Sequence, residues 1–332
     1  MTRLRMIFAL MLALTCALAV CSLFVGAVDI PVSRVMGVLT GGESSDVEQF
    51  VVMQSRLPQT VTALVCGAAL AVCGLLLQCI FRNPLADPSV LGVNSGAALG
   101  VALVMLAGAS LQGAMGIGAT VLAAFAGAMA VTALLWAISH FVSHNVALLI
   151  VGLMTGYLVS AFITVLNYFA TEQGVKSYMV WGMGSFSDVA PQNIGVFAAA
   201  AAIGLVGAIW IVKPLGVLQM GESQAASLGV NVRRTRKTTF VVCGWLVAFT
   251  TAFCGPVAFI GLAAPHIARM LVRTDSLVAL MPATALTGAM VALVCNVACS
   301  LPGMGAMLPV NAVTPLIGAP IVIYIILRRR RF

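Results

Sequence analysis

Acidic side chains, which would carry a proton relay or hold a cation, are scarce in this 332-residue chain. Carriers driven by protons or ions usually place such groups inside the bilayer. The nine acidic residues here all fall in predicted loops or near the ends of apolar runs: Asp29, Glu43, Asp46, Glu48, Asp87, Glu172, Asp188, Glu222 and Asp275. The sequence therefore indicates no acidic relay through a membrane.

The histidines and cysteines indicate no metal site either. His140 and His144 lie one helical turn apart, but no third ligand lies nearby, so an interfacial or helix-ending role is favoured. His266 follows Pro265, and a packing role in a broken helix is favoured over metal binding. The nine cysteines are scattered singly and form no CxxC pair, which argues against a zinc site or a redox motif. We therefore expect no metal or cofactor in this chain.

The lysines give no sign of a nucleotide site. They are Lys176, Lys213 and Lys237, and none follows a glycine as the lysine of a phosphate-binding P-loop would. The chain is therefore not expected to bind ATP in that way, nor to be an enzyme. If ATP drives its activity, a separate chain must bind and hydrolyse the nucleotide.

The composition predicts an all-α, multi-pass membrane protein. Hydrophobic residues make up 61% of the chain and charged residues 8%, whereas soluble domains carry about a quarter charged residues. We expect a single domain over residues 1–332, embedded in the lipid bilayer. The net charge of +8 does not indicate nucleic-acid binding, because the cations lie between apolar runs and form no stripe with aromatic residues.

Ten apolar runs are expected to be transmembrane helices. Nine have both ends marked in the sequence, and one more starts near Gly92. The nine cover residues 6–28, 57–81, 115–138, 146–170, 193–212, 238–254, 257–272, 276–299 and 310–327. An even number of spans places both termini on the same side of the membrane.

Two corresponding pairs of spans are interrupted by proline-containing breaks. The first break is the run from Arg82 to Pro88, which includes Asn83, Pro84 and Asp87. The second is Gly255-Pro256, which is followed by a short span containing Pro265 and His266. Because the two pairs run in opposite directions, they predict an inverted repeat around a central pathway.

The distribution of lysine and arginine gives the orientation. Fourteen of the 17 cations fall on the side of the two termini, and three, Arg34, Arg56 and Lys176, fall on the other side. Because cytoplasmic loops carry an excess of positive charge, both termini are expected in the cytoplasm.

The longest polar interruption on the terminus side is the 213–237 segment, which carries Lys213, Arg233, Arg234, Arg236 and Lys237. These charges exclude the segment from hydrocarbon, since each costs about 2.5–3.5 kcal/mol at mid-membrane. Within it we expect a short helix over 218–228, which Gly229 ends, and a second helix capped by Asn231. Such a helical elbow suits a partner that grips it. A solvated loop joining two spans remains the alternative, and spacing alone does not decide between them.

Several motifs, in order along nearly the whole chain, resemble the permease subunits of ABC importers for iron–siderophore complexes, haem and cobalamin. In the first half they are Arg56-Leu57-Pro58, Gly67-Ala68-Ala69-Leu70-Ala71, Gln78, the run from Arg82 to Pro88, and Leu91-Gly92-Val93. At the centre they are Gly221-Glu222, Ala225, Leu228-Gly229-Val230 and Arg236. Later they are Gly255-Pro256, Phe259-Ile260-Gly261-Leu262, Pro265-His266-Ile267, Arg269, Leu308-Pro309-Val310, Thr314 and Ile317-Gly318-Ala319-Pro320.

This resemblance implies a permease of the bacterial inner membrane that pairs with a second copy of itself. Two ATP-binding subunits, which hold ATP and Mg²⁺, would grip its cytoplasmic face, and a substrate-binding protein would dock outside. The residues implied in ATPase coupling are Gly221, Glu222, Ala225, Leu228, Gly229, Arg233 and Arg236. Receptor docking is expected at Arg56 and Lys176, and the translocation pathway at Gly152, Met154, Thr155, Thr314 and Gly318.

Three positions depart from the pattern that the family shows on its outer face. They are Gln59, Met307 and Asn311, and they leave the receptor contacts open. The nature of the metal chelate or corrinoid is also open. Two other functions remain as alternatives: a secondary transporter or facilitator that acts alone, and a membrane scaffold that transports nothing. Uptake by vesicles without ATP would favour the first, and the absence of an ATPase partner would favour the second.

Overall fold

The computed structural model describes residues 2–42, 45–106, 112–139, 141, 145–300 and 307–329, and every regular element within those ranges is helical. His140 and His144 lie outside the described residues. The first half contains α1 (Thr2–Phe24), α2 (Val32–Thr40), α3 (Asp46–Phe50), a π-helix (Val51–Arg56), α4 (Leu57–Phe81), a 3-10 turn (Pro88–Leu91), α5 (Val93–Met105), α6 (Gln112–Ile138) and α7 (Asn145–Phe169). The second half contains α8 (Glu172–Gly182), a 3-10 turn (Pro191–Asn193), α9 (Ile194–Leu218), α10 (Glu222–Ser227), α11 (Val232–Cys254), α12 (Ile260–Val272), α13 (Leu277–Cys299) and α14 (Val310–Arg329).

The helices agree with the predicted number of spans. Seven are long and apolar enough to cross a membrane, judged by length and composition. Three shorter apolar stretches, Val93–Met105, Ile260–Val272 and Val310–Tyr324, make up the rest. Each of the ten falls in one of the ten regions that the sequence predicts. The expected all-α, multi-pass architecture is therefore confirmed.

Two helix boundaries differ from those expected. The second span is preceded by more helix, so that Asp46–Phe81 forms one continuous helical stretch of 36 residues. Ser45 starts it with a capping box to Glu48, and the π-helix carries the backbone into Pro58, which has no N–H to donate. The sixth span also runs on past Val212, through Pro214, to Leu218. The helix therefore ends six residues later than expected.

The core lies where α4 crosses α11, and small residues bring the surrounding backbones together. A Cβ added at Gly74 would lie 1.9 Å from the Gly261 carbonyl oxygen, and one at Gly67 would lie 2.3 Å from the Gly288 oxygen. At the crossing, the Cys73 thiol donates to the Cys243 carbonyl at 3.7 Å, and the Cys243 thiol donates to the Cys73 carbonyl at 3.8 Å. The two helices thus make the same contact in both directions.

The packing of the helices follows the predicted inverted repeat. The helix α4 of the first half packs against α12 and α13 of the second half. In the same way, α11 of the second half packs against α5 and α6 of the first half. Similarly, α7 packs on α5 as α14 packs on α12. Each broken pair contains a non-glycine residue with a left-handed backbone, Arg82 (φ 48°) after α4 and Phe259 (φ 69°) before α12. Because this conformation is disfavoured for side-chain-bearing residues, both breaks are held by their surroundings.

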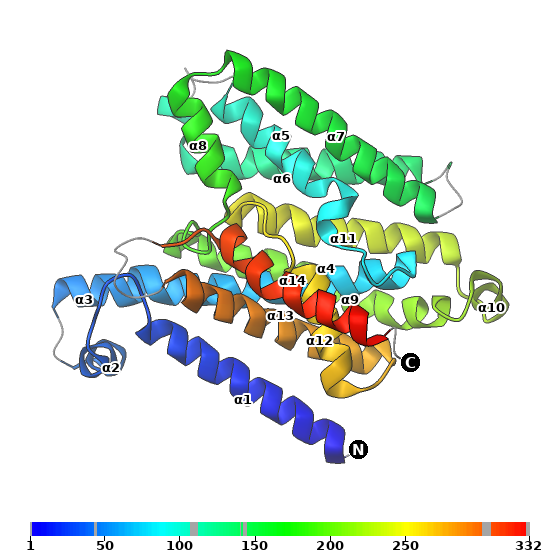
Figure 1. Ribbon diagram of the computed structural model, residues 1–332, viewed down its shortest axis with the longest axis horizontal. Coiled ribbons are helices and arrows are strands. Elements are labelled where there is room, and N and C mark those ends of the chain that lie inside the picture. Colours follow the sequence, from blue (N-terminus) through cyan, green and yellow to red (C-terminus); the bar gives the residue numbers. More distant parts are fainter. Residues whose placement is uncertain are drawn as a thin grey trace.

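Figure 1 shows how the elements are distributed along the molecule. The helix α10 lies at one end, and α2 and α3 lie at the other. The first turn of α1 and the last described turn of α14 lie in the same half of the view as α10. The helix α8, in a stretch expected only to be polar, lies toward the end away from α10. This arrangement agrees with two termini and a 213–237 segment that share one side.

Candidate functional site

The 213–237 segment forms a compact helical turn between α9 and α11. Gly221 (φ 138°) separates the end of α9 from α10, and Gly229 (φ 80°) follows α10. The amides of Gly229 and Val230 donate to the carbonyls of Ala226 and Ala225, both at 3.0 Å. This pair of hydrogen bonds is a Schellman motif, which favours glycine at the left-handed position. The predicted helix end at Gly229 is therefore confirmed, although α10 is shorter than the helix expected over 218–228.

The start of α11 is also as predicted. The side-chain oxygen of Asn231 accepts from the Arg234 amide at 2.9 Å, which caps the helix. Arg233 and Arg234 are exposed in the first turn, so these two cations of the segment face outward. Both the turn and the cap were therefore predicted correctly, because each depends on hydrogen bonds between neighbouring residues.

One face of α10 is exposed, and the other is anchored. Ala225 is fully buried against the protein, whereas Glu222, Leu228 and Gly229 are exposed. Leu228 is 65% exposed and Met220 is 66% exposed, so the surface around α10 carries two large apolar side chains as well as the acidic Glu222. Exposed apolar side chains that are grouped with polar ones are typical of a surface that binds another protein.

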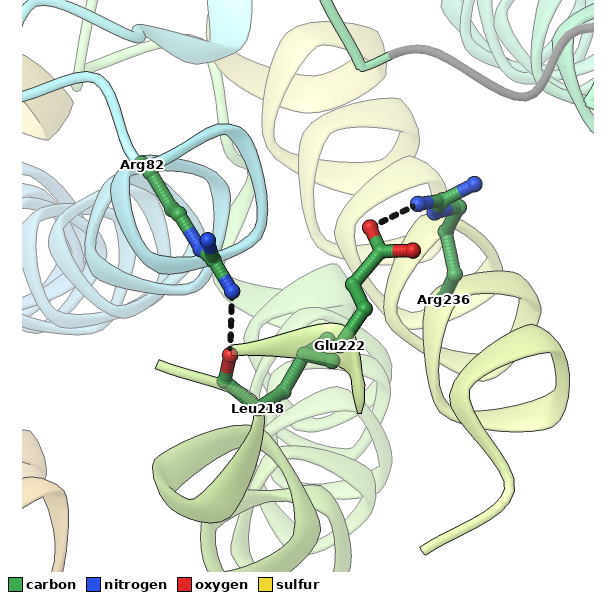
Figure 2. A network of polar contacts seen from close by, with 4 residues as sticks. All are labelled: Arg82, Leu218, Glu222 and Arg236. Atoms are coloured by element: carbon green, nitrogen blue, oxygen red, sulfur yellow. Dashed lines mark hydrogen bonds and ion pairs between the residues drawn. The ribbon is translucent and has the colours of Figure 1, made fainter. Parts of the chain in front are cut away.

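An ion pair fixes the orientation of α10 against α11. The Arg236 guanidinium lies 2.7 Å from the Glu222 carboxylate, as Figure 2 shows. The Arg236 side chain is 12% exposed and that of Glu222 is 51% exposed. Because an exposed pair contributes little stability, its main effect here is to position the Glu222 side chain.

The C-terminal end of α4 holds the base of the segment. Arg82 donates from Nη2 to the Leu218 carbonyl at 2.8 Å, the second contact in Figure 2. Nearby, Gln219 Nε2 lies 3.0 Å from Cys79 Sγ. The rings of Phe81 and Phe240 lie 5.9 Å apart and join α4 to α11. The end of α4 is therefore bonded to the end of α9 and packed on α11, on both sides of α10 in the chain.

The loop after Arg82 connects this anchor to the second half of the chain. His266 Nε2 lies 2.8 Å from the Pro84 carbonyl oxygen, and Arg269 donates to Gln78 Oε1 at 2.9 Å. Asn83 accepts from the Leu85 amide at 2.9 Å, which shapes the turn. The expected structural motif thus forms one hydrogen-bonded joint between the end of α4 and α12.

Asp87 and Pro88 complete the joint. The Asp87 carboxylate accepts from the amide and the hydroxyl of Ser89, and so caps the short turn that follows. Burial raises the pKa of Asp87 above its ordinary value, and the bonds from Ser89 act in the opposite direction. Pro88 packs so closely on Gly261 that a Cβ there would lie 2.7 Å from its ring. The loop is thus packed directly onto the start of α12.

Gly255 and Pro256 form the second break, and Pro265 follows it within α12. Gly255 has φ 71°, and a Cβ there would lie 2.5 Å from the Trp181 carbonyl oxygen. The Pro256 carbonyl accepts from Asn311 at 2.5 Å. Pro265 lies inside α12 and is buried. This break therefore touches α8 and α14, not the 213–237 segment.

Arg56, which the resemblance implies in receptor docking, is buried in the single chain. The side chain is 4% exposed, and its guanidinium donates to the carbonyls of Leu23 and Phe24, at the C-terminal end of α1, and of Val28, just beyond that end. Those carbonyls have no partner within α1, so the cation satisfies them and complements the helix dipole. The role of Arg56 in receptor docking stays a prediction. Lys176 is exposed on α8 at the end away from α10, as docking requires.

Two of the three departures from the family pattern are not surface positions. Gln59 is buried and donates to Asn296 at 2.7 Å, and Asn296 donates to Ser22 at 2.9 Å. Asn311 binds the carbonyls of Gly182 and Pro256. Both side chains are therefore part of the internal packing, and only Met307 is exposed. An amide within an apolar run needs a buried partner, and that signal was available in the sequence.

The expected pathway residues divide into two groups. Gly152, Thr314 and Gly318 are buried within the chain, where Gly152 lies against Gly92 and Gly318 against Phe259. Thr155 is half-buried and its hydroxyl donates to the Val151 carbonyl at 2.8 Å. Met154 is 51% exposed on α7. Of the five, only Met154 has the exposure expected of a lining side chain in the single chain.

Comparison with known proteins gives one consistent result. The model of the FecCD transport family matches residues 13–328. The vitamin B12 import system permease protein BtuC of Salmonella paratyphi A is 37% identical over 286 residues, 85% of each chain, and so is that of Salmonella typhimurium. Neither of the two alternative functions, a carrier acting alone or a scaffold, fits these relatives.

Two solved structures also match. One is described as an inward-facing conformation of a metal-chelate type ABC transporter; it has a TM-score of 0.85, is 31% identical, and the match covers 98% of this chain and 99% of that one. PsaBC from Streptococcus pneumoniae, in complex with Fab, has a TM-score of 0.55 at 15% identity, covering 88% and 95% of the chains, and shares the fold. The chain therefore belongs to the FecCD transport family and is the non-catalytic, membrane-spanning permease of an ABC importer.

Proposed function

We propose that two copies of this chain pair around one pathway, and that two ATP-binding subunits engage the two 213–237 segments. Those subunits hold the ATP and Mg²⁺, and a substrate-binding protein delivers the cargo on the opposite face. The observation that carries this proposal is α10, an exposed short helix that the Glu222–Arg236 pair ties to α11 and that follows the end of α9, where Arg82 binds the Leu218 carbonyl. A helix held in this way passes a partner's movement to the membrane helices.

Pairing of two copies is supported by the bare surface of α7. Only 22% of the most apolar window of α7 is buried inside the chain. Met154 and Phe162 stand exposed on this helix, at 51% and 56%. We place the translocation pathway between this helix and its counterpart α14, with the second copy supplying the facing surface. The pathway then re-aims as the two copies tilt, which is a two-state change that partners can bias at both faces.

The orientation follows from the charge distribution. We place both termini and the 213–237 segment in the cytoplasm of a bacterium, with α8 on the outer side of the inner membrane. Single-cysteine labelling tests this placement: Glu222→Cys should react with an impermeant reagent only in inside-out vesicles. Met179→Cys, on exposed α8, should react only from the outside. The opposite pattern would refute the orientation.

A charge-reversal pair tests the role of Glu222. In the reconstituted complex, Glu222→Lys should abolish binding of the ATP-binding subunit and ATP-dependent uptake. The double variant Glu222→Lys with Arg236→Glu restores an internal ion pair of opposite sense. If Glu222 meets the partner, the double variant stays inactive. If it recovers full uptake, the side chain serves only the fold of the segment and the coupling proposal fails at this residue.

Gly229 allows a second test with a matched control. No atom lies within 4 Å of a Cβ built at this position, so the first added carbon meets no atom of the chain. Gly229→Asn tolerates the left-handed backbone, whereas Gly229→Trp adds both strain and bulk. We expect association with the ATP-binding subunit to survive in the asparagine variant and to be lost in the tryptophan variant. Equal uptake by both would contradict a gripped α10.

A further inference from the structure

A large cavity lies beside α8, at the end of the bundle away from α10. Its volume is about 1020 Å³, and it separates α8 from the ends of α6 and α11. We call it the α8 cavity. It is lined by Met105, Thr120, Val121, Thr171, Glu172, Gln173, Lys176, Ser177, Val180, Trp181, Asp188, Ala252 and Phe253. No element of the 213–237 segment contributes to it.

The helix α8 presents two different faces. Gly174 packs on the end of α5 so closely that a Cβ there would lie 2.6 Å from the Met105 carbonyl oxygen. The rings of Tyr178 and Trp181 stack 6.2 Å apart. The face that carries Lys176 and Val180 instead opens into the α8 cavity. The helix is thus anchored to α5 at Gly174, and the α8 cavity opens beside this contact.

The lining of the cavity is divided between charge and hydrocarbon. Val121 and Phe253 belong to membrane-spanning helices and form an apolar wall. Glu172, Lys176 and Asp188 bring two negative charges and one positive charge. Within the described parts of the chain, the one ion pair joins Arg236 to Glu222, so none of these three side chains has a charged partner. Both charge signs are therefore available to a bound molecule.

These features suit an amphiphile better than water. At about 30 Å³ per molecule, the cavity would hold on the order of 30 waters, many of them against hydrocarbon. A soluble protein would bring a polar surface to that apolar wall. A molecule with an apolar chain and a head of two opposite charges fills both parts. Phospholipids are the amphiphiles that surround helix ends in a membrane.

We propose that the α8 cavity binds one phospholipid with a primary amine in its headgroup, from the leaflet away from the 213–237 segment. Lys176 binds the phosphate, while the carboxylates of Glu172 and Asp188 accept hydrogen bonds from the ammonium group. An acyl chain lies along the wall formed by Val180 and Phe253. A quaternary ammonium carries the same charge but has no N–H to donate, so the site selects phosphatidylethanolamine over phosphatidylcholine.

Native mass spectrometry of the delipidated full chain tests this site. The chain is titrated separately with phosphatidylethanolamine, phosphatidylcholine and phosphatidylglycerol. We expect phosphatidylethanolamine to bind at least about tenfold more tightly than the other two, a difference near 1.4 kcal/mol. Equal retention of all three lipids, or the tightest binding for the anionic lipid, would overturn the assignment.

Two neighbouring residues of α8 provide a matched pair. Val180 lines the cavity and is 61% exposed, while Met179 is 59% exposed and does not line it. Val180→Trp should fill the cavity and lower phosphatidylethanolamine binding about tenfold, whereas Met179→Trp should leave it unchanged. Glu172→Gln, a change of nearly equal size, should reduce the preference over phosphatidylcholine without unfolding α8. If neither Val180→Trp nor Glu172→Gln alters lipid binding, the proposal is refuted.

One further measurement separates lipid from protein. Val180→Cys is labelled with a maleimide in the presence of phosphatidylethanolamine vesicles or of the substrate-binding protein in lipid-free detergent. Protection by the vesicles supports the lipid site. Protection by the binding protein alone would mean that the α8 cavity is a docking surface, and the proposal would be wrong. Its failure would leave the role of the 213–237 segment untouched, because the tests of Glu222 and Gly229 use the opposite end of the molecule.

Discussion

The helices α4 and α7 have nearly the same length and apolar character but opposite surroundings. Each has 25 residues, and the apolar windows of their spans have mean hydropathies of 2.4 and 2.2. Yet 89% of the apolar window in the span that includes α4 is buried inside the chain, whereas 22% of the apolar window in α7 is buried. Hydropathy therefore indicates that a helix lies in the membrane, but not whether protein or lipid surrounds it.

The size of the side chains accounts for the difference. Along α4, Gly67 and Gly74 meet the backbones of α13 and α12, so neighbours can close around this helix. On α7, Gly152 lies close to the short turn before α5, and Gly156 lies close to the first residues of α5. Many of the bulky side chains of α7 are exposed. Without a hydrophobic force between helices in lipid, close packing of small residues drives their association. The core thus follows the small residues, and α7 is left for a second copy or for lipid.

The largest effect should come from deleting an aromatic side chain in the core. Phe249 on α11 is 1% exposed and its ring lies 5.3 Å from that of Phe197. Phe249→Ala should lower the free energy of unfolding by about 3–5 kcal/mol. The same change at Phe162 on α7 should cost the single chain little and weaken its pairing instead. Thermal unfolding in one detergent, with size measurement by light scattering, checks both, and equal losses of stability would break the comparison.

Adding a methyl group at a helix contact should have the next largest effect. Gly74→Ala places its Cβ against the Gly261 backbone and should destabilise by about 1–3 kcal/mol. Gly118→Ala meets nothing within 4 Å and should be neutral or stabilising by up to about 1 kcal/mol. Melting temperatures of the two variants measure this contrast. Tolerance of alanine at both positions would show that small residues do not define the core.

Cutting the link between α4 and α9 should have a moderate effect on stability. Arg82→Asn removes the hydrogen bond to Leu218 but keeps a residue that tolerates the left-handed backbone. We expect a loss of about 1–2 kcal/mol and a larger fall in ATP-driven uptake than in binding of the ATP-binding subunit. Arg273→Asn is the matched control, since Arg273 is likewise left-handed (φ 53°) and exposed, and it follows α12 instead of α4. A similar fall in uptake for both variants would argue against transmission through Arg82.

The smallest effect should come from the cap of α11. Asn231→Ala removes the acceptor for the Arg234 amide and should cost about 1 kcal/mol. Hydrogen exchange in the first turn of α11 should become faster, while the α4–α11 crossing keeps its protection. Asn231→Ser retains a capping oxygen and should restore slow exchange. Faster exchange throughout α11 would mean that the 213–237 segment and the core are not separable in stability.

Local chemistry was readable from the sequence, and long-range partners were not. The ten apolar regions, the turn at Gly229 and the cap at Asn231 depend on neighbouring residues, and all were predicted. The burial of Arg56 depends on the end of α1, more than 25 residues away, and that of Gln59 on Asn296. The α8 cavity could not be foreseen, because its wall is drawn from four separate helices.

The reciprocal contact of Cys73 and Cys243 has a consequence for the origin of the fold. The thiol of each cysteine donates to the backbone carbonyl of the other, so the two repeats make the same contact from both sides. An ancestral half-length chain that inserted in both orientations would form the same contact with its own inverted copy. Gene fusion would then have freed one half to acquire the turn at Gly229 while the shared joint stayed in place. A split protein, expressed as two halves, should accordingly reassemble at this crossing.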